Sequence, residues 1–249
     1  MKTKNKFLNN ILSVFIAVFA AILIRSFLFE PFNIPSGSMK PNLLVGDFIF
    51  VSKYSYGYSR HSFPFSLGDP AGKLISGKFL ERLPKRGDVV VFKTPENNRT
   101  DYIKRIIGLP GDKIKIINGE IQINDKRILK QKIDEFIDTD NSELYINDGR
   151  RRQYLEYFYD QEIKVLDLID GTFADNTNEF RVPENKYFVM GDNRDNSQDS
   201  RFQSVGYIPA DNIIGKAEFI FFSLENARFL EIWKWPTSIR YNRLFKKIK

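Results

Sequence analysis

Apolar residues gather first near the N-terminus, and further along the chain they come in short runs. Residues 7–29 read FLNNILSVFIAVFAAILIRSFLF, and the apolar centre, 11–24, contains one serine as its only polar residue. A helix needs roughly 20 residues to cross the hydrocarbon layer. The flanks supply the missing length, because Asn9 and Asn10 can lie at one interface while Arg25 extends toward the other. The pattern predicts one transmembrane anchor over residues 7–29.

A cleaved signal peptide and a buried core helix are the alternatives to an anchor. A cleaved signal needs a small-x-small site directly after its apolar core, but the nearest such trio, at residues 36–38, lies well downstream beyond two prolines. Lys2, Lys4 and Lys6 precede the span. The positive-inside rule therefore predicts that residues 1–6 are cytoplasmic and that the chain after the anchor lies across the membrane.

The remaining chain, residues 30–249, alternates short β-favouring runs with turn residues. Runs of β-branched and aromatic residues predict strands at 48–51, 89–92, 113–117, 120–123 and 187–190. Asn118-Gly119 stands between two alternating runs, which is the pattern of a two-residue β-hairpin. Short strands separated by Gly-Asp, Asn-Gly and Pro-Gly turns indicate a mainly β fold.

Two segments depart from this pattern. Residues 133–178 are polar and acidic, with few turn pairs, and they predict a second lobe inserted into the main β core. Residues 229–249 mix aromatic and basic residues, a composition that suits a membrane interface. A basic tail that packs a few aromatics on the core is the alternative, and the segment is too polar for a second span.

The composition narrows the possible chemistry. The 249 residues include no cysteine, which excludes disulfides and thiolate metal sites. They include one histidine, His61, through which any Ser-His-Asp triad would have to run. The net charge of +7 is compatible with nucleic acid, an anionic membrane surface or simply a basic proteome. We expect no nucleic-acid partner, because no recognition module accompanies the basic residues.

A candidate nucleophile follows the anchor, where residues 30–41 read EPFNIPSGSMKP. Pro31 and Pro35 favour extended backbone, and Gly37 permits a tight turn at Ser38. A serine hydroxyl needs a base before it can attack, and Ser-Lys pairs are an alternative to Ser-His-Asp. A lysine can serve only as the neutral amine, so it must lie in a dry site that lowers its pKa.

Lys104 is the candidate base. It lies in the run YIKRIIG, residues 102–108, which has the alternation of a strand. On a strand, Lys104 shares a face with Tyr102 and Ile106, and that face is available for burial. A strand lysine is usually solvated, so Lys104 gains its meaning only beside a suitable serine.

A third polar segment, residues 191–201, reads GDNRDNSQDSR. Taken alone, it is a surface loop or a calcium-binding loop, because alternating Asp and Asn oxygens are the ligands that calcium prefers. It lacks the terminal bidentate glutamate of a helix-loop-helix calcium site.

PSGSMKP, the YIKRIIGLPGD run and GDNRDNSQDSR resemble the conserved boxes of type I signal peptidases, and LPKRGDVVVF at residues 83–92 resembles a fourth box. Their order and their position relative to the anchor also match, and the resemblance covers the anchor and roughly half of the remaining chain. It implies a signal-peptidase-type β-barrel or sheet as the catalytic core. It also implies a membrane-bound serine endopeptidase that removes signal peptides from exported pre-proteins after a small-x-small site.

The same resemblance implies roles for individual residues. Ser38 is the expected nucleophile and Lys104 the general base, with no cofactor and no metal. The Ser36 side chain and the Ser38 backbone N–H form the expected oxyanion hole, and Ser197 orients the Lys104 amine. The supporting salt-bridge network corresponds to Asp192, Asp199 and Arg201. His61 receives no role.

Substrate binding is expected beside the Ser38 segment and the Lys104 strand. The family's shallow apolar pockets correspond to Phe32, Ile34, Met39, Leu43, Tyr102 and Ile103. Small pockets exclude large side chains and favour Ala-x-Ala. The expected partners are pre-proteins and the lipid bilayer, and the expected location is the bacterial inner (cytoplasmic) membrane, crossed once.

Two other classes of protein share some of these features. Self-cleaving repressors use a Ser-Lys pair on a similar β fold, but they predict a DNA-binding domain where the apolar span stands. A membrane-tethered binding protein that has lost catalysis would have no physical reason to keep a buried lysine with its serine.

Overall fold

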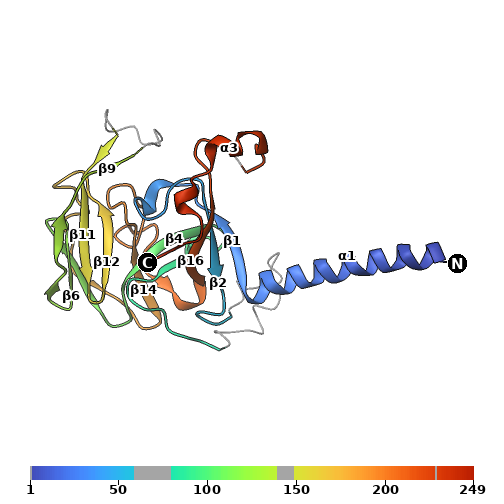
Figure 1. Ribbon diagram of the computed structural model, residues 1–249. Helices are drawn as coiled ribbons and strands as arrows, with labels where there is room; N and C mark the ends of the chain where they lie inside the picture. Colours follow the sequence, from blue (N-terminus) through green and yellow to red (C-terminus); the bar gives the residue numbers. More distant parts are fainter. Residues whose placement is uncertain (1, 59–79, 139–148, 228) are drawn as a thin grey trace.

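The computed structural model describes residues 2–58, 80–138, 149–227 and 229–249, so His61 lies outside the described residues. Helix α1 (Lys2–Phe27) projects alone from the β core (Figure 1). Its segment Asn10–Phe27 has a mean hydropathy of 2.1 and is long and apolar enough to cross a membrane. The helix ends two residues before the predicted boundary, because Phe29 already pairs with Ser52 in the first strand.

The main sheet has eight strands, and its neighbouring strands run antiparallel in the order β1-β2-β16-β3-β4-β14-β15, with β17 paired to β16. The strands are β1 (Phe29–Asn33), β2 (Asp47–Ser52), β3 (Val89–Lys93), β4 (Asp101–Gly108), β14 (Lys186–Met190), β15 (Ile208–Pro209), β16 (Ile213–Ser223) and β17 (Lys246–Lys247). The strands predicted at 48–51, 89–92 and 187–190 are thus confirmed to within one residue at each end.

The sequence pattern missed β16, although this strand lies at the centre of the sheet. Lys216 and Glu218 interrupt its apolar run, which hides the strand from a periodicity argument. In the fold, Lys216 pairs with Asp88, and Glu218 accepts a hydrogen bond from Ser52 at 2.6 Å. Tertiary partners therefore make these charged side chains acceptable on a central strand.

Three smaller sheets form the second lobe, on the side of the main sheet away from α1 (Figure 1). Their strands are β5 (Lys113–Ile117), β6 (Glu120–Ile123), β7 (Lys126–Arg127), β8 (Lys130–Lys132), β9 (Phe136–Ile137), β10 (Arg150–Arg151), β11 (Gln153–Phe158), β12 (Gln161–Leu166) and β13 (Phe180–Arg181). The strands of these three sheets span residues 113–181, a range that includes the inserted lobe expected at 133–178.

The β5–β6 hairpin is the one that the sequence predicted. Ile117 lies opposite Glu120, and the two turn residues, Asn118 and Gly119, both have positive φ, 51° and 73°. Two central residues with positive φ define the tight turn whose twist matches that of paired strands. The strands at 113–117 and 120–123 are confirmed at both ends.

Apolar packing joins the lobe to the main sheet. One buried cluster contains Ile107 of β4 and Phe188 of β14 together with Ile114 and Ile163 of the lobe. On the main sheet, Val89 and Val91 of β3 enter a second cluster, whereas Val90 and Phe92 enter a third. Alternate residues of one strand thus serve opposite faces, and the lobe shares its core with the body that carries the site.

The C-terminal segment folds back over β2 and β16 as η5 (Ile232–Lys234), α3 (Trp235–Ser238), η6 (Tyr241–Arg243) and β17. Some of its aromatic rings pack on the sheet, as Trp235 does against Phe222 at 4.9 Å between ring centroids. Other aromatic side chains, including Trp233 and Tyr241, are exposed, and so is Leu230. The segment therefore packs some of its aromatic side chains on the core and leaves other apolar side chains exposed.

Candidate active site

Ser38 lies in a single 3₁₀ turn, η1 (Gly37–Met39), that directly follows β1 and an extended approach. The N–H of Lys40 closes the turn on the Gly37 carbonyl at 3.1 Å. From the opposite side, the Asn193 backbone N–H donates to the Ser38 carbonyl at 3.0 Å, and the Asn193 side chain donates to the Gly37 carbonyl at 3.1 Å. Asn193, which the sequence did not single out, therefore fixes the turn that presents Ser38.

The structure brings Ser38 and Lys104 together. Lys104 lies on β4, and its Nζ atom donates to Ser38 Oγ at 2.8 Å and to the Ile103 carbonyl at 3.0 Å. Lys104 is 4% exposed and Ser38 7% exposed, so water has little access to either group. The expectation that Lys104 is buried on its strand is met.

Burial has a direct consequence for the Lys104 amine. Desolvation disfavours the charged ammonium and is the largest effect, whereas Asp199 and Asp192 favour it and Arg201 opposes it. The net result lowers the pKa of Lys104 from its usual 10.5 to about 8. A substantial fraction of the amine is then neutral near neutral or mildly alkaline pH, which a lysine base requires.

Ser36 lies beside the same turn. It precedes η1, and its Oγ atom is 3.5 Å from Ser38 Oγ. The first N–H groups of a helical turn have no partner within that turn, and Ser38 is the second residue of η1. The Ser36 hydroxyl and the Ser38 N–H are thus placed on the same turn as the Ser38 hydroxyl.

Ser197 differs from expectation in its partner. Among the described hydrogen bonds, the Ser197 hydroxyl donates to Asp199 Oδ2 at 2.8 Å, and none joins it to the Lys104 amine. Asp199 also accepts from the Gly191 N–H at 3.0 Å and from Arg201 Nε at 2.8 Å. Ser197 therefore contacts Asp199, the carboxylate that favours the charged form of Lys104, and not Lys104 itself among the described hydrogen bonds.

Gly191 leaves the space into which this arrangement fits. A Cβ atom at position 191 would stand 2.3 Å from Ser197 Oγ and 2.5 Å from the Ser38 carbonyl oxygen. Both distances are shorter than van der Waals contact. The glycine thus allows the Asp199 loop to pass directly behind the Ser38 turn.

Asp192 is paired with Arg105, a residue outside the expected salt-bridge network. Arg105 donates to both Asp192 oxygens at 2.7 Å, and both side chains are 1% exposed. The Arg105 guanidinium also donates to the carbonyls of Gly87 and Lys249, at 2.7 and 2.8 Å. The expected salt-bridge network is therefore two pairs, Asp192 with Arg105 and Asp199 with Arg201. A buried arginine next to Lys104 could not be recognised from sequence because its partners lie far along the chain.

The six expected substrate-binding residues fall into two groups. Phe32, Tyr102 and Ile103 are half-buried and keep exposed surface. The other three, Ile34, Met39 and Leu43, are at most 2% exposed and belong to the core cluster that also contains β2 and β16 residues. In this structure the second group supports the site from beneath and does not line its surface.

Two carboxylates of the polar loop at 191–201 form ion pairs with protein side chains, and this weakens the interpretation of the loop as a calcium site. Asp192 and Asp199 are held by arginines as described above. A third loop carboxylate, Asp195, has an oxygen within 4.8 Å of oxygens of Asp167 and Asp175, a group that could hold a metal ion. The Lys130 ammonium already pairs with Asp167 there, so a positive charge occupies part of this group.

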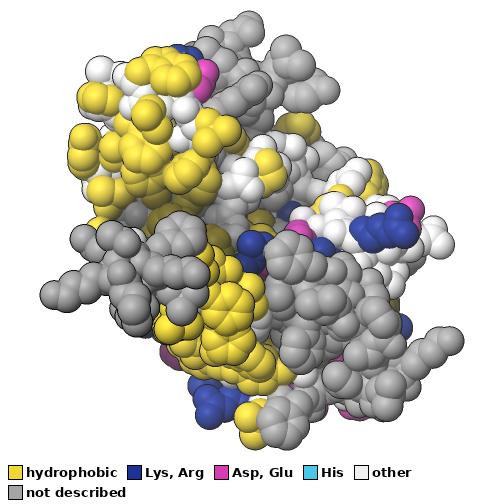
Figure 2. All heavy atoms as spheres, turned by 90° about the vertical axis from the view of Figure 1, so that its right-hand side faces the viewer, with side chains coloured by type: hydrophobic (Ala, Val, Ile, Leu, Met, Phe, Trp, Pro, Cys, Tyr) yellow, Lys and Arg dark blue, Asp and Glu magenta, His cyan; other side chains and the backbone are white. Residues whose placement is uncertain are grey.

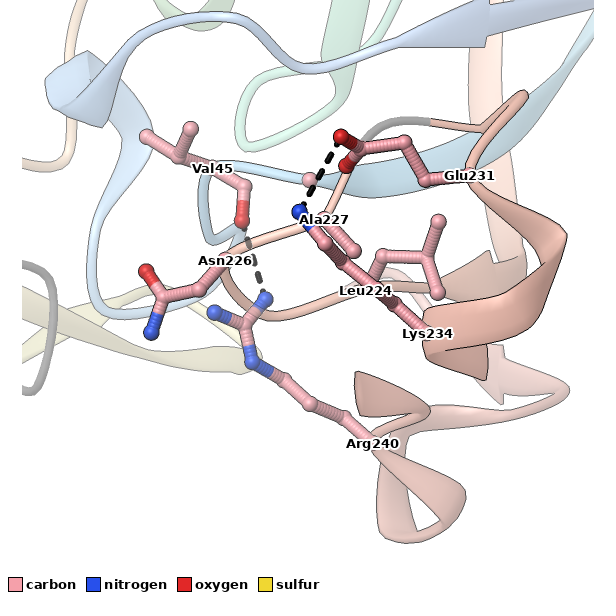
Figure 3. A pocket seen from close by; sticks show the side chains of 8 residues that line it. Val45, Leu224, Asn226, Ala227, Glu231, Lys234 and Arg240 are labelled. Carbon is pink, nitrogen blue, oxygen red and sulfur yellow. Dashed lines mark hydrogen bonds and ion pairs between the residues drawn. The ribbon is translucent and has the colours of Figure 1, made fainter. Parts of the chain in front are cut away.

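A separate pocket of about 600 Å³ lies beneath the C-terminal segment (Figure 3). Lys234 points toward Glu231 across it, with an Nζ to Oε1 distance of 3.0 Å, and Arg240 donates to the Val45 carbonyl at 2.9 Å. Neither Ser38 nor Lys104 lines this pocket. The candidate catalytic pair therefore lies outside this pocket.

A serine hydroxyl hydrogen-bonded to a desolvated lysine amine, on a mainly β scaffold, defines the class of Ser-Lys hydrolases. The family model described as signal peptidase, peptidase S26, matches residues 7–222. The signal peptidase I of Rickettsia typhi is 40% identical over 238 residues, which cover 92% of this chain and 89% of the relative. The signal peptidase I of Rickettsia conorii is also 40% identical, over 92% of this chain and 88% of its own length. The chain belongs to the signal peptidase family, peptidase S26.

Among solved structures, a signal peptidase I from Enterococcus faecalis is similar, with 25% sequence identity and a TM-score of 0.32 over 54% of this chain and 97% of that one. Family membership establishes the general activity. The chain is a serine peptidase that removes signal peptides from pre-proteins, and its family is associated with membranes.

Proposed function

We propose that this signal peptidase cleaves exported pre-proteins with Ser38 as the nucleophile and Lys104 as the general base. The distance of 2.8 Å between Lys104 Nζ and Ser38 Oγ carries this proposal, because the pair is buried and the amine has a lowered pKa. No other described serine is needed as nucleophile in this scheme.

The chemistry proceeds in two steps. Neutral Lys104 takes the Ser38 proton as Oγ attacks the scissile carbonyl; the peptide C–N bond then breaks and the leaving amine takes the proton. The Ser38 acyl ester remains, and Lys104 activates a water that hydrolyses it, returning the proton to Ser38. The Ser36 hydroxyl and the Ser38 N–H stabilise the oxyanion in each step, and each such donor contributes about 3 to 4 kcal/mol in other acyl-transfer enzymes.

Strand edges beside Lys104 support binding of an extended substrate. β14 pairs with residues 105–108 of β4, so among the described strands the segment 101–104 has only β3 as a neighbour. β1 also lies at an edge of the main sheet, and it leads directly into the Ser38 turn. A cleavage segment can add at such edges through backbone hydrogen bonds. Half-buried Phe32, Tyr102 and Ile103 then bound small pockets that favour Ala-x-Ala.

The proposed location follows from α1 and from the surface beside it. The lysines before the apolar span predict a cytoplasmic N-terminus and an extracytoplasmic catalytic region at the bacterial inner membrane. Figure 2 shows hydrophobic side chains gathered on the face from which α1 projects. Exposed apolar residues of the C-terminal segment include Leu230, Ile232 and Trp233. Such a face suits contact with the bilayer.

The catalytic proposal is tested by cleavage of a purified pre-protein in detergent, with mass spectrometry of the product termini. Wild type should cut after a small-x-small site, whereas Ser38→Ala and Lys104→Ala should fold and lose turnover. Lys115→Ala removes an exposed strand lysine and serves as the matched control. His61→Ala should remain active, and a folded but inactive His61 variant would refute the dyad.

The topology is tested by labelling, since the chain has no cysteine. Asp170→Cys introduces a thiol at a side chain that is 80% exposed. We expect this thiol to react with a membrane-impermeant maleimide in intact spheroplasts. Labelling that requires lysis would contradict the proposed orientation.

A further inference from the structure

The residue two positions after Ser38 is a fully buried lysine. Lys40 is 0% exposed, and its Nζ atom lies 2.8 and 3.0 Å from the two carboxylate oxygens of Asp138. The two residues are 98 positions apart in the sequence. The main chain of Lys40 caps the Ser38 turn, since its N–H donates to the Gly37 carbonyl. The lysine thus fixes the turn with its backbone and reaches the second lobe with its side chain.

Asp138 is itself held in place. It directly follows β9, and its N–H donates at 2.7 Å to the carbonyl of Gly149, which directly precedes β10. Gly149 has a φ of +71°, and a Cβ atom there would lie 2.9 Å from the Asp138 carbonyl oxygen. Arg151, also buried, brings its Nε atom to 3.6 Å from the carboxylate. The hairpin therefore presents the Asp138 carboxylate in a defined position.

A second contact joins the same chain segment to the lobe. The Asn42 side chain donates to the Lys164 carbonyl of β12 at 2.7 Å and to Asp192 at 2.7 Å. Asn193 holds the Ser38 turn from the side of the catalytic loop, as described above. Contacts from the lobe to Lys40 and Asn42 hold the chain segment that directly follows the Ser38 turn.

We propose that Asp138, acting through Lys40, is a positioning residue for the Ser38 turn, so that the β9–β10 hairpin of the second lobe takes part in catalysis. This inference rests on Ser38 being the nucleophile. Neither side chain of the pair has to touch the substrate. Loss of the carboxylate removes the counter-charge of a buried ammonium, which is strongly unfavourable, and a shift of the Lys40 side chain also displaces the residue that caps the turn. Small displacements of a nucleophile are costly, because an error of about 1 Å can reduce the rate roughly 100-fold.

The test compares Asp138→Asn and Lys40→Met with Asp170→Asn, all in the full chain in detergent. Asp170 forms an exposed ion pair with Arg152 in the same lobe and serves as the matched control. We expect each Asp138 or Lys40 variant to lower kcat about 10- to 100-fold with KM changed less than about twofold. The control should keep wild-type kcat. An unchanged kcat in folded Asp138→Asn would overturn the proposal.

A double variant separates positioning from stability. Lys40→Met with Asp138→Leu replaces the buried ion pair by apolar side chains, and such exchanges often keep or raise stability. Positioning predicts that the melting temperature recovers while kcat stays low; joint recovery of both would show a merely structural role. If Asp138→Asn fails to fold, Lys40→Arg is measured instead, because it keeps the positive charge but changes the position of the cation. Positioning predicts a lower kcat in Lys40→Arg, and full activity together with full stability in this variant would contradict the proposal.

Two further readouts complete the test. The pH at which activity rises should be the same in Asp138→Asn as in wild type, and a shift would mean that Asp138 acts on the charge of Lys104 instead of on the turn. Ser38→Ala is measured in parallel. An active Ser38→Ala would refute the proposed function itself, whereas an inactive Ser38→Ala beside a fully active Asp138→Asn would refute only the positioning role.

Discussion

The Nζ atom of Lys104 lies 2.8 Å from Ser38 Oγ, although the two residues are 66 positions apart in the chain. The two side chains come from different structural units: a 3₁₀ turn that follows the edge strand β1, and the interior of β4. Their contact depends on three arginine- or asparagine-centred supports, at Arg105, Arg201 and Asn193. Substitutions at Ser38 or Lys104, and also at the residues that support them, should therefore change the activity of the pair.

The first prediction concerns pH. Because only the neutral Lys104 amine can accept a proton, kcat/KM should rise with pH through about 8, the lowered pKa of Lys104. Below that value the neutral fraction, and with it the rate, should fall about tenfold for each pH unit. Initial rates on a peptide substrate between pH 5 and 10 measure this profile. A flat profile across pH 6 to 9 would exclude Lys104 as the base.

The second prediction concerns a variant in which the pH profile of activity should shift. The Asp199 carboxylate favours the charged form of Lys104, and Arg201 opposes it. Asp199→Asn removes the first influence and leaves the second, so the pKa of Lys104 should fall and the activity profile should shift toward lower pH. The variant should also lose stability, because buried Arg201 loses its partner. Asp160→Asn, at an exposed site, should leave the profile in place; a shift of the Asp199 profile to higher pH would refute the explanation.

The third prediction tests the close approach at Gly191. A methyl group at this position overlaps Ser197 Oγ and the Ser38 carbonyl, so Gly191→Ala should displace the Ser38 turn. We expect kcat to fall at least about 100-fold. Gly111→Ala is the matched control, since a Cβ there meets no atom within 4 Å and only its φ of +84° is unfavourable. Equal activities in the two variants would show that the overlap is relieved without cost.

The fourth prediction concerns the C-terminal residues. Ile248 is 7% exposed and packs in the cluster that contains Met39 and Leu43, directly beneath the Ser38 turn. Ile248→Ala should lower the free energy of unfolding by about 2 to 4 kcal/mol through the lost contacts and the cavity. Lys247→Ala, next to it and exposed, should change stability little. Chemical denaturation in detergent compares the two, and equal effects would mean that Ile248 contributes no core packing.

The sequence was sufficient for features that depend on local pattern. The apolar span, the Asn118-Gly119 hairpin and most strands follow from periodicity and turn residues, and the motifs directed attention to Ser38 and Lys104. The supports behind these residues could not be foreseen in the same way. Asn193 and Asp138 act through contacts between segments far apart in the chain. The local sequence around an asparagine or an aspartate does not predict such a contact.

Burial was also hard to foresee for residues close to the motif. Met39 and Leu43 follow Ser38 within five positions, yet they point into the core beneath the turn. An apolar residue near a nucleophile can face either the substrate or the interior, and the choice depends on how β2 and β16 pack against the turn. Ser197 shows the same limit for a polar residue, since its partner was decided by where Asp199 lies.

The short connection between α1 and the Ser38 turn has a consequence for which bonds can be cut. The helix ends at Phe27 and β1 begins at Phe29, already paired to β2, so the connection has almost no slack. Ser38 lies eleven positions after Phe27, a stretch that spans at most about 40 Å even when fully extended. With the helix embedded in a bilayer, this short connection limits how far Ser38 can lie from the lipid surface. We therefore expect a scissile bond to be selected by its depth relative to the membrane as well as by its side chains, so that an identical sequence anchored far from the lipid surface is not cut.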